Sequence, residues 1–152
     1  MAKPRSGSTA DALNMMVEAA KPLVKPPAHI KLTKEEQPFW KAIIECKPPN
    51  DWSDSDYILI GQLAKVHRLI NIEHDKLVKE GMILNGKANP RIRVVNQLTA
   101  RQGVLMRSLR LAGVPQGMTG MSARQDVQRN RAFRSAKRAQ AQVGAEGEDL
   151  LA

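Results

Sequence analysis

A chain of 152 residues with a formal net charge of +9 can form one compact domain with flanking tails, and its basic excess favours a polyanionic partner. Its one cysteine, Cys46, excludes an internal disulfide framework and a cysteine zinc cluster, and we interpret it as a small buried side chain rather than a nucleophile. Two Phe, two Trp and one Tyr are too few for binding that relies on base stacking. No apolar run is long enough to span a bilayer and no signal peptide is recognised, so a cytosolic protein without membrane contact is expected.

Residues 1–31 are expected to form a flexible N-terminal arm that ends in a proline-rich linker. Within this arm, residues 9–21 could form a short helix. The predicted buried stripe of that helix consists of Leu13, Met16, Val17 and Ala20. Pro22, Pro26 and Pro27 then make the following chain stiff and extended, so it should link the arm to the rest of the protein.

The helical core is expected over residues 32–115, and its first helix begins near Thr33. Thr33 and Glu36 have the spacing of a capping box, in which each residue satisfies a backbone donor of the other. Phe39 and Trp40 are predicted to lie on the buried face of this helix. Two consecutive prolines then end it.

Two long helices follow, joined by a connection that is too short for anything but a chain reversal. Ser53 is the predicted N-cap of the first helix, and Gly81 is its predicted stop. Asn89 is the predicted cap of the second, with Pro90 at the first helical position and Gly113 at the end. The two helices are therefore expected to pack as a long antiparallel hairpin.

The apolar sector of the first long helix covers about half of its circumference, which is wider than the roughly 100° that one partner helix needs. One explanation is that Phe39 and Trp40 fold back over the surplus. The explanation that we favour is that neighbouring copies of the chain cover it, through contacts that repeat around an axis and close a ring-like homo-oligomer. The residues predicted at this interface, together with their flanking positions, are Leu59, Leu63, Val66 and Ile70.

Residues 116–152 are expected to form a flexible tail that is basic first and acidic at its end. Residues 124–138 contain six cations against Asp126 and have good helix formers without an apolar stripe, because Val127 and Phe133 lie far apart around a helix. We therefore expect this segment to be ragged in the free protein. The whole chain is predicted to be all-α, with short N-terminal helices packed on the long hairpin, assembly into a ring, and this basic tail.

The basic charge of the core is concentrated in residues 81–115, which contain six basic residues and no acidic one. Many arginines and few aromatics favour binding to the phosphates of double-stranded DNA. The start of the second long helix offers backbone amides beside Arg91 and Arg93, which is either an anion site or an ordinary capped helix. The residues predicted to contact DNA are Arg91, Arg93, Arg107, Arg110, Arg124, Arg129, Arg131, Arg134, Lys137 and Arg138.

No group of residues in the sequence predicts catalysis, a cofactor or a metal. His67 and His74 lie seven residues apart on one helix, which is too far for one ion, since i, i+3 or i, i+4 spacing is needed. We interpret both as core or interface histidines. No glycine-rich phosphate loop and no Ser–His–Asp grouping is present, so a protein that is not an enzyme is expected.

The order of segments over residues 30–116 resembles that of the small terminase subunits of tailed bacteriophages. The matching segments are LTKEEQPFWKAII, DWSDSDYILIGQLA, EGMILNGKANP and LMRSLRLAGVP, the last of which leads into the arginine-rich tail. The resemblance implies an all-helical subunit that forms a ring of roughly nine copies and binds viral double-stranded DNA at the packaging initiation site. It also implies recruitment and regulation of the large terminase subunit, which carries the ATPase and nuclease. The implied location is the host cell cytoplasm, outside the mature virion.

A second interpretation of the same charge is a dimeric basic DNA-binding regulator or nucleoid-type protein. Such a protein would need a defined recognition helix, which the sequence pattern does not reveal. The mass of the native particle separates the two interpretations, because a ring is a large closed oligomer and a regulator of this kind is a dimer.

Overall fold

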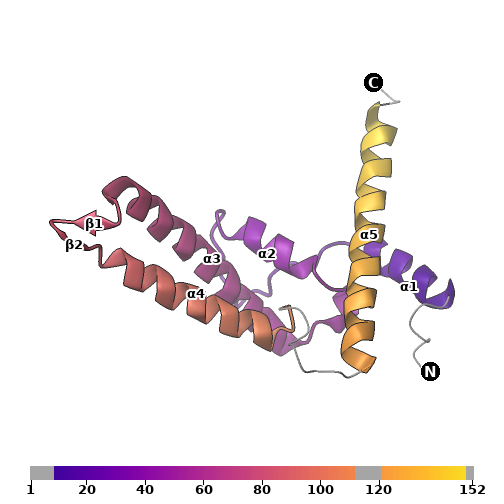
Figure 1. Ribbon diagram of the computed structural model, residues 1–152. Helices are drawn as coiled ribbons and strands as arrows, with labels where there is room; N and C mark the ends of the chain where they lie inside the picture. Colours follow the sequence, from indigo (N-terminus) through magenta and orange to yellow (C-terminus); the bar gives the residue numbers. More distant parts are fainter. Residues whose placement is uncertain (1–8, 112–120, 150–152) are drawn as a thin grey trace. The chain divides into compact units, whose positions relative to one another are not determined.

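The computed structural model describes residues 9–111 and 121–149, and these residues are mostly helical (Figure 1), as the all-α prediction requires. A short 3₁₀ turn and a two-stranded sheet complete the secondary structure of this part of the chain. The elements in chain order are α1 (Thr9–Ala20), α2 (Gln37–Ile44), η1 (Pro49–Asp51), α3 (Asp54–Glu80), β1 (Ile83–Leu84), β2 (Lys87–Ala88), α4 (Arg91–Ser108) and α5 (Met121–Asp149).

The chain divides into two compact units that are interleaved in sequence. One contains α1, residues 44–53 and α5, and the other contains residues 25–43, α3, the two strands and α4. This grouping differs from the three consecutive segments expected from composition, because α1 and α5 pack on each other although more than 100 residues separate them.

The larger unit is built on the packing of α3 against α4 (Figure 1). Both helices bury a stripe of aliphatic side chains and expose their charged sides, as an amphipathic helix does when it packs on one partner. The buried apolar residues of the pair are Ile60, Leu63, Ala64, Val66, Leu77, Val95, Leu105 and Leu109.

The chain itself covers part of the surplus apolar surface of α3. Trp40 is buried beside Tyr57, with the ring centroids 6.2 Å apart, and Phe39 stacks on His67 at 5.5 Å. Ile30 of the linker packs on Gly61, where an added Cβ would lie 2.6 Å from its Cγ2 atom. Folding back by α2 is therefore confirmed, although apolar residues on the flank of the stripe remain exposed.

One bond of the capping box predicted near Thr33 and the predicted stop of α3 are present in the structure. The backbone N–H of Thr33 donates to the Glu36 carboxylate at 2.9 Å, which is one half of the predicted capping box. Gly81 has a φ of +84° and its N–H donates to the Leu77 carbonyl, so it ends α3 at the predicted position.

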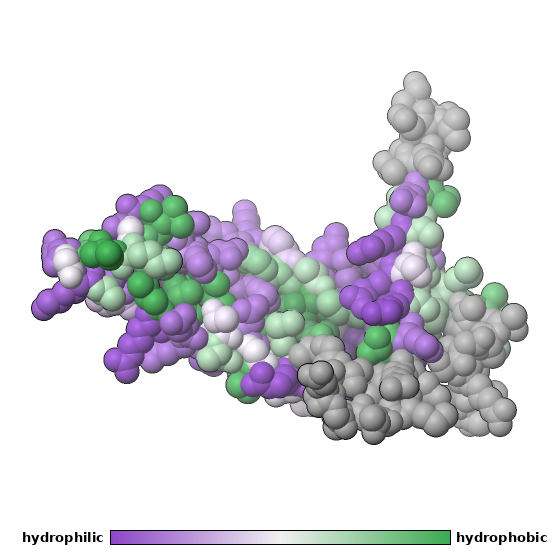
Figure 2. All heavy atoms as spheres, in the orientation of Figure 1, coloured by the Kyte–Doolittle hydropathy of each residue, from purple (hydrophilic) through white to green (hydrophobic). Residues whose placement is uncertain are grey.

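The connection between α3 and α4 is a two-stranded antiparallel sheet with a tight turn at Asn85 and Gly86. Both turn residues have positive φ, +51° and +74°, which is the conformation of a type I′ turn and is favoured by the Asn–Gly pair. Figure 2 shows apolar surface at this end of the unit, where Val78, Met82 and Ile83 are exposed.

The prediction that α4 extends to Gly113 was wrong, because the helix ends at Ser108. Arg110 adopts a φ of +53°, its N–H donates to the Arg107 carbonyl, and the N–H of Leu111 donates to the Met106 carbonyl. These two bonds are the Schellman pattern that normally has glycine at the left-handed position. Gly113 itself lies outside the described residues.

The smaller unit is held together by Phe133 of α5, which is only 2% exposed and packs with Met15 and Ala19 of α1. The prediction of which side of α1 is buried was wrong. Leu13, Met16 and Val17 are exposed, and Met15 and Ala19 on the opposite side of the helix are buried.

Polar contacts also connect the parts of the smaller unit. The Arg129 guanidinium lies 3.0 Å from the Asp51 carboxylate, and the Gln140 amide donates to the Met16 carbonyl at 3.2 Å. The α5 segment is helical in the structure rather than ragged, because one large aromatic side chain provides an apolar contact where a continuous stripe is lacking.

Candidate nucleic-acid interface

Asn89, which is 2% exposed, fixes the start of α4. Its side-chain oxygen accepts a hydrogen bond from the N–H of Arg91 at 3.0 Å, so it provides the predicted cap. Its side-chain amide donates to the Gly81 carbonyl at 3.0 Å and to the Glu80 carboxylate at 3.2 Å. One buried side chain thus joins the end of α3 to the start of α4.

The backbone amides at this helix start are already occupied. Besides the Arg91 N–H, the Ile92 N–H donates to the Asn89 carbonyl at 3.0 Å, and the Arg93 N–H donates to the Pro90 carbonyl at 3.1 Å. Of the two alternatives left open by the sequence, the ordinary capped helix is therefore the one that the structure supports, since a phosphate would find no free backbone N–H on these three residues.

Arg91 is paired with two carboxylates of α3. Its guanidinium lies 2.8 Å from Glu73 and 2.8 Å from Glu80, and Lys76 also pairs with Glu73 at 2.9 Å. Hydrogen bonds to Glu80 and Glu73 raise the pKa of Arg91. Hydrogen bonds from Lys76 and Arg91 hold the pKa of Glu73 below its usual range, and those from Arg91 and Asn89 do the same for Glu80. The charge of Arg91 is thus compensated, and its position argues for a role in joining α3 to α4 rather than in DNA binding.

The other arginines of α4 have no ion pair within residues 9–111 and 121–149. Arg93, Arg101 and Arg107 are exposed on a helix that contains no acidic residue. Arg110 is also exposed, but it lies beyond the end of the helix in the Schellman turn, so it does not continue the predicted basic side of α4. Arg101 was not among the predicted contacts, although the absence of acidic residues around it could have indicated it.

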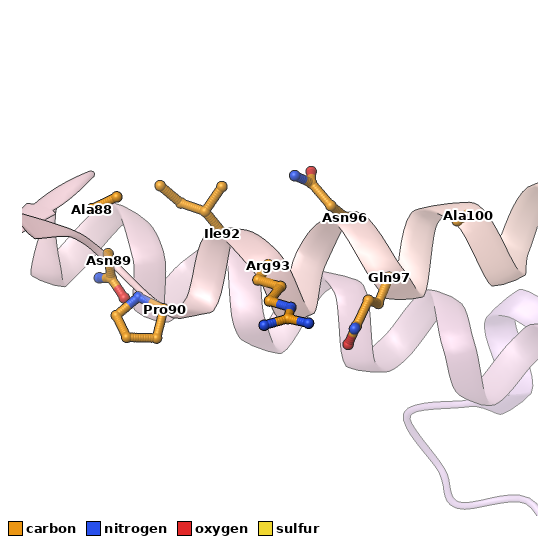
Figure 3. Close-up of a pocket in the computed structure, with 8 residues that line it drawn as sticks. All are labelled: Ala88, Asn89, Pro90, Ile92, Arg93, Asn96, Gln97 and Ala100. Carbon is orange, nitrogen blue, oxygen red and sulfur yellow. The ribbon is translucent and has the colours of Figure 1, made fainter.

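An open hollow lies along the exposed side of the first half of α4 (Figure 3). Arg93 and Gln97 point to the same side in this view, and Asn96 projects from the adjacent side of the helix. The sequence analysis did not identify these two amide side chains, although exposed amides between arginines were a possible signal. The hollow is lined by Ala88, Asn89, Pro90, Ile92, Arg93, Asn96, Gln97 and Ala100.

The predicted contacts of α5 fall into two groups. Arg129 pairs with Asp51, and the Lys137 ammonium lies 6.0 Å from the centroid of the Phe133 ring. Arg131, Arg134 and Arg138 are exposed, and Arg134 also donates to the Asn130 carbonyl of the preceding turn. The Arg124 side chain lies outside the described residues.

The four predicted interface residues of α3 differ in exposure. Leu63 and Val66 are buried within the larger unit, and Leu59 and Ile70 are half-buried. The exposed apolar positions are Ile58 and Leu69 on the flank of this stripe, at 48% and 44% exposure. Any interface on this side of α3 would therefore be made mainly by the flanking positions included in the prediction.

The histidines and the cysteine occupy ordinary structural positions. His67 stacks on Phe39, and burial lowers its pKa, while His74 is exposed. Cys46 is half-buried, and burial raises the pKa of its thiol, which disfavours the thiolate. In the part of the chain that the structure describes, no cluster of three or more His, Cys, Asp or Glu residues has the geometry to hold a metal ion.

None of the described helices is both long enough and apolar enough to cross a membrane.

Comparison with known proteins identifies relatives of the chain. The model of the Hendrixvirinae small terminase family matches residues 1–152. The chain is also similar to the terminase small subunit of Enterobacteria phage HK97, with 34% identity over 79 residues, which cover 52% of this chain and 49% of the phage protein. The match thus spans about half the length of that curated relative.

Proposed function

Because this chain belongs to the Hendrixvirinae small terminase family over its whole length, we propose that it is a packaging subunit without catalytic activity of its own. In this proposal it binds viral double-stranded DNA at the packaging initiation site. It also recruits the large terminase subunit and regulates the ATPase and nuclease of that subunit. The protein acts in the host cell cytoplasm during packaging and is absent from the mature virion.

The observation that carries the proposed DNA binding is the exposed side of α4, on which arginines have no acidic neighbour. Arg93, Arg101 and Arg107 project from a helix that contains no carboxylate. Arg91, by contrast, forms ion pairs with two carboxylates of α3. Uncompensated guanidinium groups attract phosphates and release their counterions on binding. Arg131, Arg134 and Arg138 of α5 add exposed positive charge in the other unit.

The proposed assembly is a closed ring of roughly nine subunits in which α3 and α4 form the antiparallel hairpin of each subunit. Support comes from the exposed apolar residues on the flank of α3, Ile58 and Leu69, which nothing in the larger unit covers fully. In a ring, weak contacts between DNA and each subunit add together, so a modest affinity per subunit is sufficient.

Residues 116–152 are proposed to contact DNA with their basic segment and the large subunit with their acidic end. Glu146, Glu148 and Asp149 have the opposite sign to the arginines before them, so a basic surface on the large subunit would attract them. The alternative is that the acidic end shields the arginines until DNA displaces it.

The direct test is a binding titration of the native particle with double-stranded and single-stranded DNA of the same length. Affinity for the duplex should fall steeply between about 50 and about 200 mM salt, because several cations displace counterions. Replacing Arg93, Arg101 and Arg107 together with Ala should weaken binding and reduce the salt dependence. Equal or tighter binding to single strands would contradict the proposal.

Removal of residues 144–152 separates the two roles considered for the acidic end. Docking predicts that the truncated protein no longer stimulates the ATPase of the large subunit. Shielding predicts tighter DNA binding with unchanged stimulation. If the truncation alters neither quantity, the acidic end has no part in packaging.

A further inference from the structure

We propose that the exposed side of α4 enters the major groove and reads base edges, so that this helix gives the protein a preference for particular DNA sequences. The inference rests on the proposed DNA binding and adds to it the kind of contact and the residues that make it. Its central residues are Arg93, Gln97, Ala100 and Val104.

Helical geometry places these four residues on one line along α4. At 100° per residue, positions 93, 97, 100 and 104 fall within a sector of about 60°, and their spacing covers roughly 16 Å along the axis. The opposite side of α4 carries the buried residues Val95, Leu105 and Leu109, so packing on α3 leaves this line exposed.

The arginines on either side of this line have the arrangement expected for contacts with two phosphate backbones. Arg101 and Arg107 lie about 60° to either side of the line, and both are exposed. An α-helix is about as wide as the major groove, so side chains at its two edges can reach the phosphates that border the groove.

The chemistry along the line is that of base recognition rather than of phosphate binding alone. An arginine pairs with two acceptors of guanine, and a glutamine or asparagine pairs with the donor and acceptor of adenine. Gln97 is exposed and makes no side-chain hydrogen bond within the described residues, and Figure 3 shows it pointing to the same side of α4 as Arg93.

The apolar residues of the line fit the same role. Ala100 is small enough to let the helix approach the bases closely, and Val104, at 53% exposure, can contact the methyl group of thymine. An exposed valine adds nothing to a side of a helix that only contacts water. The exposed side of α3 shows the usual pattern instead, with both acidic and basic residues such as Lys65 and Asp75.

The test is a selection of DNA from a library of random 20-base-pair duplexes, carried out with the full-length protein. The wild type should enrich a short motif over the starting library. The substitution Gln97→Ala should reduce discrimination between the motif and a scrambled duplex by about 5-fold or more, since a bidentate contact with a base contributes at least that much to discrimination. Binding to the scrambled duplex and its salt dependence should change by less than about 2-fold.

Two further variants provide the matched comparison. Asn71→Ala removes an exposed amide from α3 and should leave discrimination unchanged. Arg101→Ala with Arg107→Ala should weaken binding to the motif and to the scrambled duplex alike, because phosphate contacts are independent of sequence. Gln97→Arg should change the preferred base at one position from adenine to guanine, which a misfolded variant could not do.

Each contrary result identifies what is wrong. Enrichment of a motif that the Gln97→Ala variant still prefers to the same degree, or duplex binding without any enrichment, would overturn this inference and leave the proposed DNA binding intact. A change in the mass of the native particle of that variant would place this side of α4 between copies of the chain and also overturn it. No binding to any duplex would overturn the proposed function itself.

Discussion

At the scale of single residues, Arg110 stands out because it occupies a backbone conformation that glycine adopts more easily. Its φ of +53° lies in the left-handed region, where a side chain costs roughly 1 kcal/mol or more relative to glycine. The two hydrogen bonds of the turn stabilise the end of α4 in spite of this cost.

Arg110→Gly should therefore raise the free energy of unfolding by about 0.5–1 kcal/mol, after allowance for the greater freedom of glycine in the unfolded chain. The matched control is Arg107→Gly, which removes the same charge within the helix and should lower the free energy of unfolding by about 1 kcal/mol. Urea denaturation at a fixed protein concentration measures both. A loss of stability in both variants would show that the left-handed residue carries no strain.

At the scale of helices, the packing of the linker on α3 depends on the absence of a side chain at Gly61. An added Cβ would lie 2.6 Å from Cγ2 of Ile30, which is too close for any real contact, so the linker or the helix would have to move. At Gly103 of α4 an added Cβ would lie 3.5 Å from the Arg107 guanidinium, which is an ordinary contact.

These two glycines make a matched pair. Gly61→Ala should lower the free energy of unfolding by about 1 kcal/mol, because the overlap outweighs the gain in helix propensity. Gly103→Ala should raise the free energy of unfolding by about 0.5–1 kcal/mol, since no overlap opposes the gain in helix propensity. Thermal or urea denaturation distinguishes the two, and equal stabilisation of both variants would mean that the linker does not pack on α3.

The ion pairs between α3 and α4 make a pH-dependent contribution to stability. Lys76 and Arg91 lower the pKa of Glu73, and Arg91 and Asn89 lower that of Glu80, so the folded state binds protons less readily than the unfolded state. The contribution is present above the unfolded pKa of about 4.5 and is lost as the pH falls through the lower folded values.

Arg91→Met should therefore reduce stability at pH 7 and at low salt, while the variant and the wild type should converge below about pH 3. Urea midpoints across this pH range measure the effect. A difference between the two proteins that is independent of pH would assign the role of Arg91 to its aliphatic stem instead.

At the scale of the whole molecule, the exposed flank of α3 is the surface on which the proposed ring depends. Glutamate at Ile58 and Leu69 together should reduce the native particle to smaller species, because each protomer contact would then bury two charges. Val78→Glu is the control, since this residue is 79% exposed and lies on another side of the helix. Native mass spectrometry at micromolar concentration measures all three proteins, and a monomeric wild type would contradict ring formation.

The sequence alone determined the features that depend on neighbours in the chain. One bond of the capping pair Thr33 and Glu36, the stop at Gly81 and the cap at Asn89 are all local arrangements, and the structure confirms these three. Helical periodicity also predicted the all-α class and the burial of Trp40, and the order of segments indicated the small terminase family.

The tertiary structure alone decided which of several compatible partners each side chain has. Met15 is buried instead of Met16 because Phe133, more than 100 residues away, packs on that side of α1. Arg91 is compensated because Glu73 and Glu80 of the preceding helix lie within hydrogen-bond distance, although the sequence around it is purely basic. Periodicity describes which sides of a helix are apolar or charged, but contacts between distant segments select the side that is buried and the charge that stays free.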